Sequence, residues 1–375
     1  MRRSRMGRVG GWFTLVVLFV LGTLTFGEPA AAAPNLGRGA VFVMSNLPEG
    51  NSILVFRRAM NGRLSPAGTY PTGGRGNGTE PDALRSQGSL VLSGNLLFAV
   101  NAGSNEISVF SIGKKNLALV EKVSSGGVKP TTLAVMDDLL YVVNAGSGQI
   151  TGFRVASDGQ LPPLANSTRS LTGGPAADPS KISFTPDGGA LLVTEKGSSA
   201  NLIDVFRVGN DGLTDGPFPT PSVGTGPFGF EFDRRGYLIV SEAFGGAPGA
   251  GAASSYELAA DSTPSVISAS VGTGQTATCW VVTTGPNVYV TNTMSGTISR
   301  YRIDRDGDLS LVQAVAGNTG GAPIDMALSR EGNYLYAVVD VTGTIAAFRV
   351  EDDGELTPVR VRVDLPPFAQ GIMAW

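Results

Sequence analysis

The chain of 375 residues contains no histidine and a single cysteine, Cys279. The absence of histidine excludes Ser-His and Cys-His catalytic arrangements. Together with the single cysteine, it also excludes a zinc site built from Cys and His within the chain. One thiol cannot form an intramolecular disulfide. Because Cys279 lies in the apolar run TATCWVV, we expect a buried and unreactive side chain.

Charged side chains are also scarce. They make up only 16% of the chain, and the formal net charge is −3. This mild acidic balance lacks the electrostatic footprint of a nucleic-acid-binding protein, so we expect no nucleic-acid partner. Apolar residues account for 42% of the chain, which is enough for a large core. The 52 glycines favour many tight turns over long helices.

The first 33 residues have the three parts of a secretory signal. Four arginines lie within residues 2–8, an apolar run extends from Trp12 to Phe26, and small residues occupy Ala30–Ala33. We therefore predict a signal peptide at 1–33 and export to the periplasm or the exterior, with no membrane attachment after cleavage. An uncleaved anchor is the alternative, but the apolar run of 15 residues is shorter than the roughly 20 that a membrane span needs.

One short unit recurs along the rest of the chain. Strand-like apolar runs such as LFAVN and LYVVN are each followed by a small turn and a second strand, and several of these second strands end in an Asp-Gly hairpin signal. The apolar runs end at Asn46, Asn101, Asn144, Glu195, Glu242, Asn292 and Val339. The intervals between these residues are 55, 43, 51, 47, 50 and 47, so we count seven copies of one unit.

A further strand of each unit tends to begin at a proline. Examples are PDALRS, PTTLAV, PSKISF, PFGFEF and PIDMAL, which start at Pro81, Pro130, Pro179, Pro227 and Pro323. In the sixth unit Gln275 takes the place of the proline, and the last copy is PFAQGIMAW at the C-terminus.

Four strands per unit and seven units predict an all-β fold, a seven-bladed β-propeller with four-stranded blades in one domain at 34–375. The chain begins within one blade and ends with a first strand. We therefore expect the C-terminal strand to pair with the N-terminal blade and close the ring. A pair of β-sandwiches is the competing all-β interpretation, but it would not explain seven similar units.

Polar residues are expected to converge at one mouth of the central channel. If the proline-led strand is innermost, its start and the end of the following strand lie on the same face. The predicted ligand-binding residues are Asp82, Asn101, Asn144, Asn292 and Asp325, and the predicted catalytic residues are Glu195, Glu242 and Lys181. The competing explanation is structural, because Asn, Asp and Glu often end strands by binding nearby backbone amides.

The repeats resemble the seven-bladed propeller lactonase family, which includes 6-phosphogluconolactonase-type and carboxymuconate-lactonising enzymes. The resemblance covers about residues 38–375 and rests on LYVVNAGSGQITGFRV, SFTPDG, VTEKGSSANLIDVFRV, PFGFEFDRRGYLIVSEAFGGAPG and APIDMALSREGNYLYAV, which look like a secreted bacterial branch of that family. It implies a lactone-hydrolysing or lactone-forming enzyme. Characterised members place His and Arg at the channel mouth, and this chain has no His to match.

Two functions from different classes follow. The first is a secreted lactone hydrolase or lactonising enzyme, in which Glu195 or Glu242 activates water and Lys181 stabilises the oxyanion. In a variant of this hypothesis, Glu195, Glu242, Asp82 and neighbouring Asn side chains hold Ca²⁺ or Mg²⁺. The second is a non-catalytic secreted propeller that binds a sugar, a peptide or a surface partner. For either function we expect a monomer with a small-molecule ligand at the channel.

Overall fold

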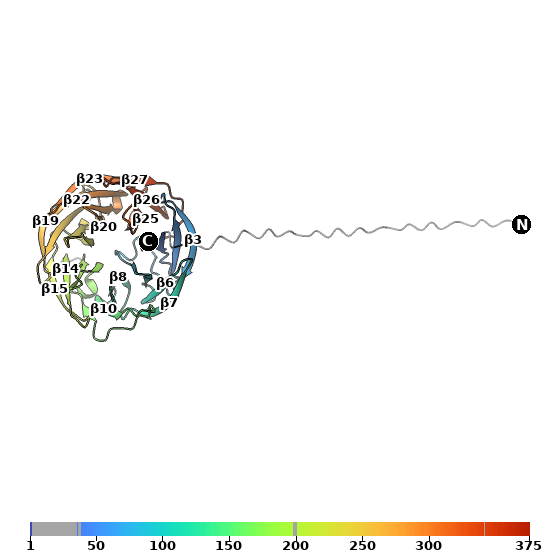
Figure 1. Cartoon of the computed structure of the whole chain (residues 1–375), viewed down its shortest axis with the longest axis horizontal. Coiled ribbons are helices and arrows are strands. Elements are labelled where there is room, and N and C mark those ends of the chain that lie inside the picture. The colour runs from blue at the N-terminus through green and yellow to red at the C-terminus, as the bar shows by residue number, and fades with distance from the viewer. Residues whose placement is uncertain (2–35, 37–38, 198–200, 341) are drawn as a thin grey trace. The chain divides into compact units, whose positions relative to one another are not determined.

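The computed structural model describes Met1, Leu36 and residues 39–197, 201–340 and 342–375. Apart from Met1, the predicted signal peptide at 1–33 lies outside the described residues. The remaining residues form seven four-stranded sheets arranged as blades around a central axis (Figure 1). The prediction of an all-β, seven-bladed propeller is therefore confirmed.

Each blade is named here by its order along the chain, with its strands given from the axis outward. Blade 1 contains β28 (Ile372–Ala374), β1 (Ala40–Met44), β2 (Ser52–Arg58) and β3 (Leu64–Pro71). Blade 2 contains β4 (Leu90–Ser93), β5 (Leu96–Asn101), β6 (Glu106–Ile112) and β7 (Leu117–Ser124). Blade 3 contains β8 (Pro130–Met136), β9 (Leu139–Asn144), β10 (Gln149–Arg154) and β11 (Arg169–Ser170). Blade 4 contains β12 (Pro179–Phe184), β13 (Ala190–Glu195), β14 (Leu202–Val208) and β15 (Thr214–Pro221).

The second half of the ring repeats this order. Blade 5 contains β16 (Pro227–Phe232), β17 (Leu238–Glu242), β18 (Ala252–Leu258) and β19 (Pro264–Gly272). Blade 6 contains β20 (Thr278–Thr284), β21 (Asn287–Asn292), β22 (Thr297–Ile303) and β23 (Leu309–Asn318). Blade 7 contains β24 (Pro323–Leu328), β25 (Tyr334–Val339), β26 (Thr344–Val350) and β27 (Leu356–Val359). Short helical turns lie at η2 (Gly174–Ala176), η3 (Phe244–Gly246) and η4 (Thr293–Ser295).

The two ends of the propeller sequence meet in blade 1. Strand β28 pairs antiparallel with β1, with Val41 opposite Ala374 and Val43 opposite Ile372. Ala40 and Trp375 then exchange backbone hydrogen bonds of 3.0 and 2.7 Å. The predicted closure by the C-terminal strand is confirmed, and it leaves no inner strand edge unpaired at the junction.

The position of a strand in its blade determines its residue pattern. The second strand of each blade is packed between two neighbouring blades, so it is an almost continuous apolar run, and all six residues of β9 are buried. The outermost strand has only one packed face. Strand β7 accordingly buries one of its eight residues, and its remaining side chains are exposed or half-buried.

The Asp-Gly hairpins also connect neighbouring blades. Gly212 and Gly354 have φ angles of 82° and 87°, a region that glycine adopts without strain. The Tyr141 hydroxyl of blade 3 donates a 2.9 Å hydrogen bond to the Gly212 carbonyl of blade 4, and Tyr289 of blade 6 donates one of 2.6 Å to Gly354 of blade 7. A buried tyrosine therefore fixes the turn of the following blade.

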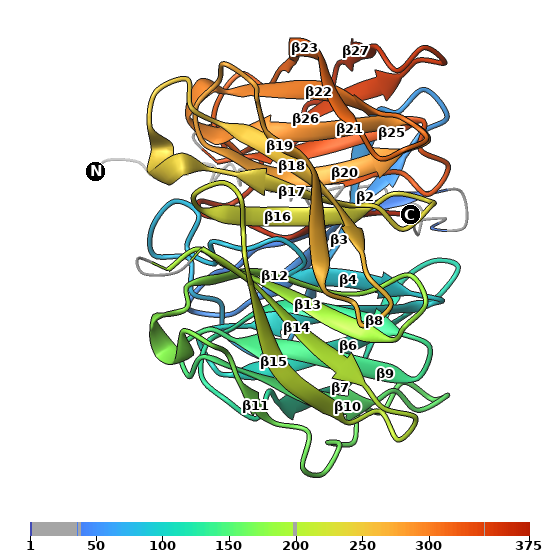
Figure 2. The same ribbon diagram turned by 90° about the vertical axis from the view of Figure 1, so that its left-hand side faces the viewer.

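The ring has two different faces. We call the closed face the one on which the second strand of each blade ends, for example at Asn144. We call the open face the one that carries the turn between the first and second strands, for example Asp137–Asp138. In Figure 2 the short helices η2 and η3 (green and yellow) project from the closed face, while the C-terminus lies on the opposite side.

Blade 2 departs from the predicted pattern. Its innermost strand was expected to begin at Pro81, but β4 comprises only Leu90–Ser93. The preceding residues Pro81–Ser89, which we call the plug, run across the channel and bind several other blades. The segment PDALRS therefore starts at the expected proline, but its backbone N–H and C=O groups do not pair with a neighbouring strand of blade 2.

Candidate functional site

The innermost strands carry irregularities that direct polar side chains toward the axis. In β12 the pairing register shifts between Pro179 and Lys181, and in β24 it shifts between Pro323 and Asp325. A bulge of this kind re-aims the side chain beside it. Lys181 and Asp325 therefore occupy equivalent positions in blades 4 and 7, and both face the channel.

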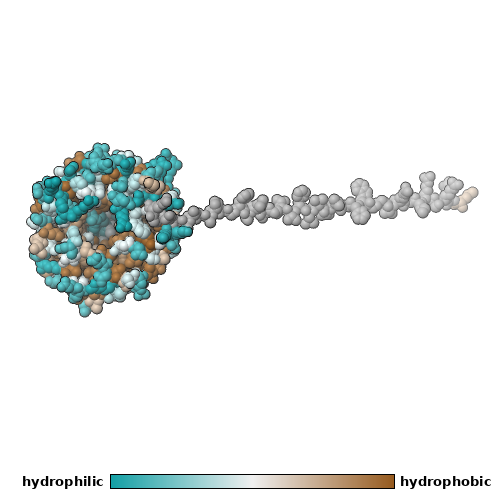
Figure 3. Space-filling view, viewed as in Figure 1, coloured by the Kyte–Doolittle hydropathy of each residue, from teal (hydrophilic) through white to brown (hydrophobic). Residues whose placement is uncertain are grey.

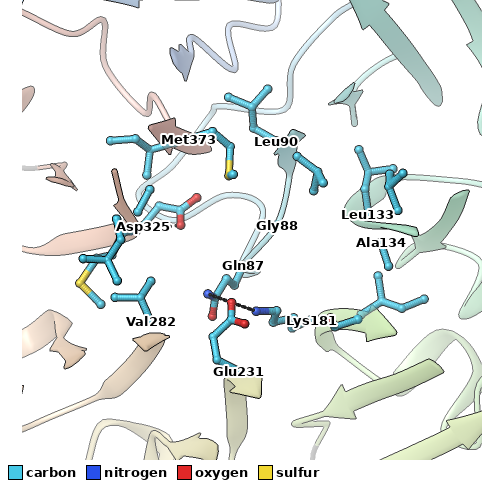
Figure 4. Close-up of a pocket in the computed structure, with 18 of the residues that line it drawn as sticks. Gln87, Gly88, Leu90, Leu133, Ala134, Lys181, Glu231, Val282, Asp325 and Met373 are labelled. Atoms are coloured by element: carbon cyan, nitrogen blue, oxygen red, sulfur yellow. Dashed lines mark hydrogen bonds and ion pairs between the residues drawn. The ribbon is translucent and has the colours of Figure 1, made fainter. Parts of the chain in front are cut away.

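All seven innermost strands contribute to a central cavity of about 350 Å³. Most of its wall is apolar, with Leu90, Leu133, Val282, Met326 and Ile372 among the lining residues. Gln87, Lys181, Ser183, Glu231, Thr283 and Asp325 supply its polar side chains. Figure 4 shows the Asp325 carboxylate directed into this space from one side, with Lys181 and Glu231 together on another. A few convergent polar groups in an apolar hollow are typical of a small-molecule site.

The plug closes the channel below this cavity. The Ser86 hydroxyl donates to the Thr131 carbonyl at 2.8 Å, and the Gln87 amide N–H donates to the Ser180 carbonyl at 2.8 Å. From the other side of the ring, the Trp280 indole donates to the Ser86 carbonyl at 3.1 Å. The plug is therefore tied to blades 3, 4 and 6 at once, and the cavity is accessible from the open face only.

A charged cluster fixes the start of the plug on the closed face. Arg85 forms a 2.9 Å ion pair with Asp178, and the Lys196 ammonium donates to the carbonyls of Arg85 and Asp178 at 3.0 Å each. Asp82 accepts a 2.6 Å hydrogen bond from Gln370, and burial raises the pKa of Asp82 to about 7. Asp82 therefore binds the plug to the C-terminal segment and does not line the cavity, contrary to the orientation predicted for it.

The cavity opens on the face that Figures 1 and 3 show. Exposure increases along the innermost strands toward this face, and Met136 and Phe232 at their ends are only partly buried. The space-filling view shows a hollow at the centre of the disc with hydrophilic residues in it (Figure 3). A ligand would enter here and meet the polar groups at the inner wall.

Lys181 and Glu231 form the central polar contact of the cavity. The Lys181 ammonium lies 2.5 Å from Glu231 Oε1, and it also lies 5.2 Å from the centre of the Phe230 ring. The Lys181 side chain is buried, whereas the Glu231 side chain keeps 34% of its surface exposed. The Glu231 carboxylate therefore remains accessible to water and to a ligand.

Asp325 is a carboxyl group in a different environment. It is only 3% exposed, and its Oδ1 accepts a 2.8 Å hydrogen bond from the Met326 amide. Burial raises the pKa of Asp325 to about 8, although backbone N–H donors and Lys181 act in the opposite direction. A group of this kind keeps its proton near neutral pH. The cavity thus presents one paired carboxylate and one carboxyl that can donate a proton.

Glu195 and Glu242 were predicted as catalytic groups, but neither lines the cavity. Glu195 is 2% exposed, and its Oε2 accepts a 2.9 Å hydrogen bond from the Gly173 amide. Burial, with the neighbouring Asp204 adding to it, raises the pKa of Glu195 to about 8. Glu242 is fully buried and accepts from the Gly224 amide at 3.1 Å. Both carboxyl groups hold loops of the closed face, so the geometry gives no support to a catalytic role.

The predicted ligand-binding asparagines occupy the same position in other blades, and they too are buried inside the ring. Asn101 donates to the Ser108 hydroxyl at 2.7 Å, and Asn144 donates to the Ser125 carbonyl at 3.0 Å. Asn292 makes equivalent contacts with side chains of its own blade. The structural explanation, in which these residues end strands by binding nearby groups, accounts for all three.

Neither Glu231 nor Gln87 was predicted from the sequence as a site residue. Glu231 had a signal, because it is the one charged residue in the inner strand PFGFEF, where an unpaired charge would be costly. Gln87 had no such signal, because its position depends on the path of the plug across the ring.

The acidic residues suggested as Ca²⁺ or Mg²⁺ ligands do not form a common site. Glu195 and Glu242 belong to different blades, and each already binds a backbone amide, while Asp82 binds Gln370. Among the residues that the structure describes, no three His, Cys, Asp or Glu side chains gather as a metal site would require. The donor set does not fit a metal.

Comparison with known proteins connects this architecture to one family. The model of a family described as lactonase, seven-bladed β-propeller, matches residues 41–174 and 253–368, about two thirds of the chain. No curated protein sequence matches this chain. Within the part of the chain that the structure describes, no helix has both the length and the apolar character needed to span a bilayer.

Solved structures share the fold at low sequence identity. A periplasmic gluconolactonase from Pseudomonas aeruginosa is 16% identical, with a TM-score of 0.69, over 90% of this chain and 98% of the other. A protein from Lactobacillus plantarum is 19% identical, with a TM-score of 0.73, over 90% and 99%. A candidate 6-phosphogluconolactonase from Bacteroides fragilis is 18% identical, with a TM-score of 0.67, over 93% and 99%. These similarities establish the fold.

Proposed function

The chain belongs to the seven-bladed β-propeller lactonase family, and we propose that its central cavity hydrolyses small lactones. The observation that supports this proposal best is the arrangement of Glu231 with Lys181 and of Asp325 around one apolar hollow. Opening a lactone needs a base for water, a positive group near the developing oxyanion and an acid for the leaving oxygen. The three side chains supply one of each.

Glu231 is assigned as the base. Its Oε1 is bound by Lys181, while its side chain remains partly exposed at the cavity. Glu231 Oε2 removes a proton from a water molecule as the water oxygen attacks the lactone carbonyl carbon. A carbon–oxygen bond forms, and the carbonyl π electrons move onto the carbonyl oxygen. The contact with Lys181 fixes the position of the carboxylate for this step.

Lys181 and Asp325 act on the next two steps. The ammonium of Lys181 lies beside the attacked carbonyl in this arrangement and stabilises the negative oxygen of the tetrahedral intermediate. When the intermediate collapses, the bond between the acyl carbon and the ring oxygen breaks. Asp325 donates its proton to that ring oxygen, and the product is an open hydroxy acid. Solvent then returns the proton from Glu231 to Asp325.

The cavity also restricts the substrate. A hollow of about 350 Å³ that the plug closes at its inner end accommodates a single small ring but no polymer, because nothing can pass through the channel. Lys181 is the one cationic side chain among the cavity-lining residues that the structure describes, and Glu231 already neutralises it. A neutral lactone, such as an aldonolactone without phosphate, fits this charge balance better than a phosphorylated one.

We further propose that the protein works outside the cytoplasm. The support comes from the basic, apolar and small-residue segments within residues 1–33. The similar structure from Pseudomonas aeruginosa is that of a periplasmic gluconolactonase. Fractionating cells that express the full chain, followed by N-terminal sequencing of the mature protein, tests this placement.

A panel of γ- and δ-lactones, with glucono-δ-lactone included, tests the proposed activity by acid release in a pH-stat. The wild-type protein should hydrolyse at least one lactone well above the buffer rate, and Glu231→Gln should abolish the excess. Glu195→Gln and Glu242→Gln serve as matched controls, and both should retain turnover. No hydrolysis of any lactone, together with saturable binding of a sugar or peptide, would support the non-catalytic alternative instead.

A further inference from the structure

The plug does more than close the channel, because one of its side chains reaches the proposed base. Gln87 is 5% exposed and lines the inner end of the cavity. Its side-chain amide contacts Glu231 in blade 5 and the backbone of Val281 in blade 6. These contacts join blade 2 to the far side of the ring, as Figure 4 shows for Gln87 and Glu231.

The contacts with Val281 fix the orientation of the Gln87 amide. The Gln87 Nε2 donates to the Val281 carbonyl at 2.7 Å, and the Val281 N–H donates to Gln87 Oε1 at 3.3 Å. This two-way pairing imitates a neighbouring strand, and it would be lost if the oxygen and nitrogen were exchanged. The second N–H of Nε2 consequently points to Glu231 Oε1, at 3.5 Å.

Glu231 Oε1 is therefore approached by two donors, Lys181 at 2.5 Å and Gln87 at 3.5 Å. Among the described residues, neither Gln87 nor any other side chain donates to Oε2. One oxygen is held by the protein, and the other is left for water. This division matters for a general base, because proton transfer requires a defined direction of approach.

Gly229 makes room for this arrangement. A Cβ atom at position 229 would lie 2.2 Å from Gln87 Oε1, far inside contact distance. The φ of Gly229 is not in the left-handed region, so the backbone conformation alone does not require glycine. The close approach of Gln87 Oε1 and of the Cys279 carbonyl oxygen, which would lie 2.7 Å from that Cβ atom, does.

We propose that Gln87 is a positioning residue for Glu231, and that the plug thereby forms part of the reactive site. The inference rests on the proposed lactonase function. Gln87 does not touch the reacting atoms, and it acts by holding one carboxylate oxygen so that the other faces the bound water.

Gln87→Met tests this role because it keeps the length of the side chain and removes the amide. We expect kcat to fall roughly 3- to 10-fold, the effect of one lost hydrogen bond, with KM nearly unchanged.

Ser86→Ala is the matched control. It removes the plug's hydrogen bond to the Thr131 carbonyl without touching Glu231. If Ser86→Ala and Gln87→Met lower kcat equally, the plug is only structural and the proposal is wrong. The thermal midpoint of each variant shows whether the protein remains folded.

A measurement without substrate separates this proposal from the proposed function. The side-chain carboxyl resonance of Glu231 can be recorded by ¹³C NMR at one pH in the wild type, Gln87→Met and Ser86→Ala. Its chemical shift should change in Gln87→Met but not in Ser86→Ala, because only the first variant removes a donor to Glu231 Oε1. That result would support the positioning role even if no lactone were hydrolysed. An active wild type with an unchanged Glu231 chemical shift in Gln87→Met would overturn it.

Discussion

The Lys181 ammonium and the Glu231 carboxylate meet at 2.5 Å although they belong to different blades. Lys181 follows the bulge of β12, and Glu231 comes from β16 of the next blade. The contact therefore depends on how blades 4 and 5 pack against each other, and neither blade could form it alone. It also places Lys181, the one cation among the described residues that line the cavity, beside the proposed base.

Replacing Glu231 should remove turnover without unfolding the protein. Glu231→Gln keeps the shape of the side chain but cannot accept a proton from water, so kcat should fall by about 10²- to 10⁴-fold. The Glu231 side chain is partly exposed, and the thermal midpoint should change little. Rates from the pH-stat and a thermal melt measure the two effects. Equal loss of activity in Glu195→Gln would move the site to another part of the ring.

Replacing Lys181 should affect the chemical step more than substrate binding. Lys181→Met removes the positive charge beside the oxyanion, and we expect kcat to fall by about 10²-fold with a small change in KM. Lys181→Arg should restore part of the rate because it can still pair with Glu231. Initial rates over a range of lactone concentrations distinguish kcat from KM. A change confined to KM would assign Lys181 to substrate binding.

Asp325 should determine the alkaline limit of activity. Burial raises the pKa of Asp325 to about 8, so its proton is present below that pH and is lost above it. If Asp325 protonates the leaving oxygen, kcat should decrease as the pH rises through about 8. In Asp325→Asn the rate should be about 10- to 100-fold lower, and this limb should disappear. An alkaline limb that persists in the variant would show that another group titrates there.

Buried carboxyl groups should also make the protein less stable at high pH. The pKa of Glu195 is raised from 4.5 to about 8, mainly by burial, so the folded protein keeps a proton that the unfolded chain releases in this range. The contribution of this group to stability is therefore fully present below pH 4.5 and is lost as the pH rises toward 8, by up to about 1.4 kcal/mol per pH unit for each such group.

Glu195→Gln tests this dependence, because the amide imitates the protonated carboxyl. The free energy of unfolding of the variant should vary less steeply with pH, and at pH 8 the variant should be more stable than the wild type. Urea unfolding between pH 5 and pH 8.5 measures both. Parallel curves for the two proteins would show that the Glu195 proton does not contribute to the slope.

Removing the C-terminal strand should open the ring. Deletion of residues 371–375 removes β28 and its pairing with β1, and also the burial of Ile372. We expect a loss of at least about 3 kcal/mol of stability, with a strong tendency to aggregate through the exposed edge. Met60→Ala, at a side chain exposed in the same blade, should behave like the wild type in denaturation and light scattering. Unchanged stability of the truncated protein would contradict the closure.

The fold could be predicted in detail because its units repeat. Each blade provides the same signals, and an error in one copy is corrected by the others. The closing strand was predictable for a related reason. Six innermost strands precede it in the sequence, and PFAQGIMAW provides the seventh. Blade 2 differed most, because Pro81 begins the plug rather than β4, and β20 and β28 begin at Thr278 and Ile372 rather than at the expected Gln275 and Pro367.

The site could be predicted only in part. Asp82, Lys181 and Asp325 were all predicted to point toward the channel because they lie near the starts of innermost strands, and of these three Lys181 and Asp325 line the cavity. Glu195 and Glu242 end second strands on the closed face, where they hold loops. The repeat pattern indicates the face on which a residue lies, but not whether its side chain turns toward the axis or into the blade. The contact of Gln87 with Glu231 joins residues 144 positions apart, and no repeat encodes it.

The order of synthesis gives the pairing of β28 with β1 a further consequence. The first blade lacks its innermost strand until residues 372–374 have left the ribosome. Every nascent chain that does not yet include these residues therefore exposes one edge of β1, which is available to chaperones, proteases or a second nascent chain. The ring can close only once β28 has been synthesised, so termination before Ile372 should yield a product that is degraded.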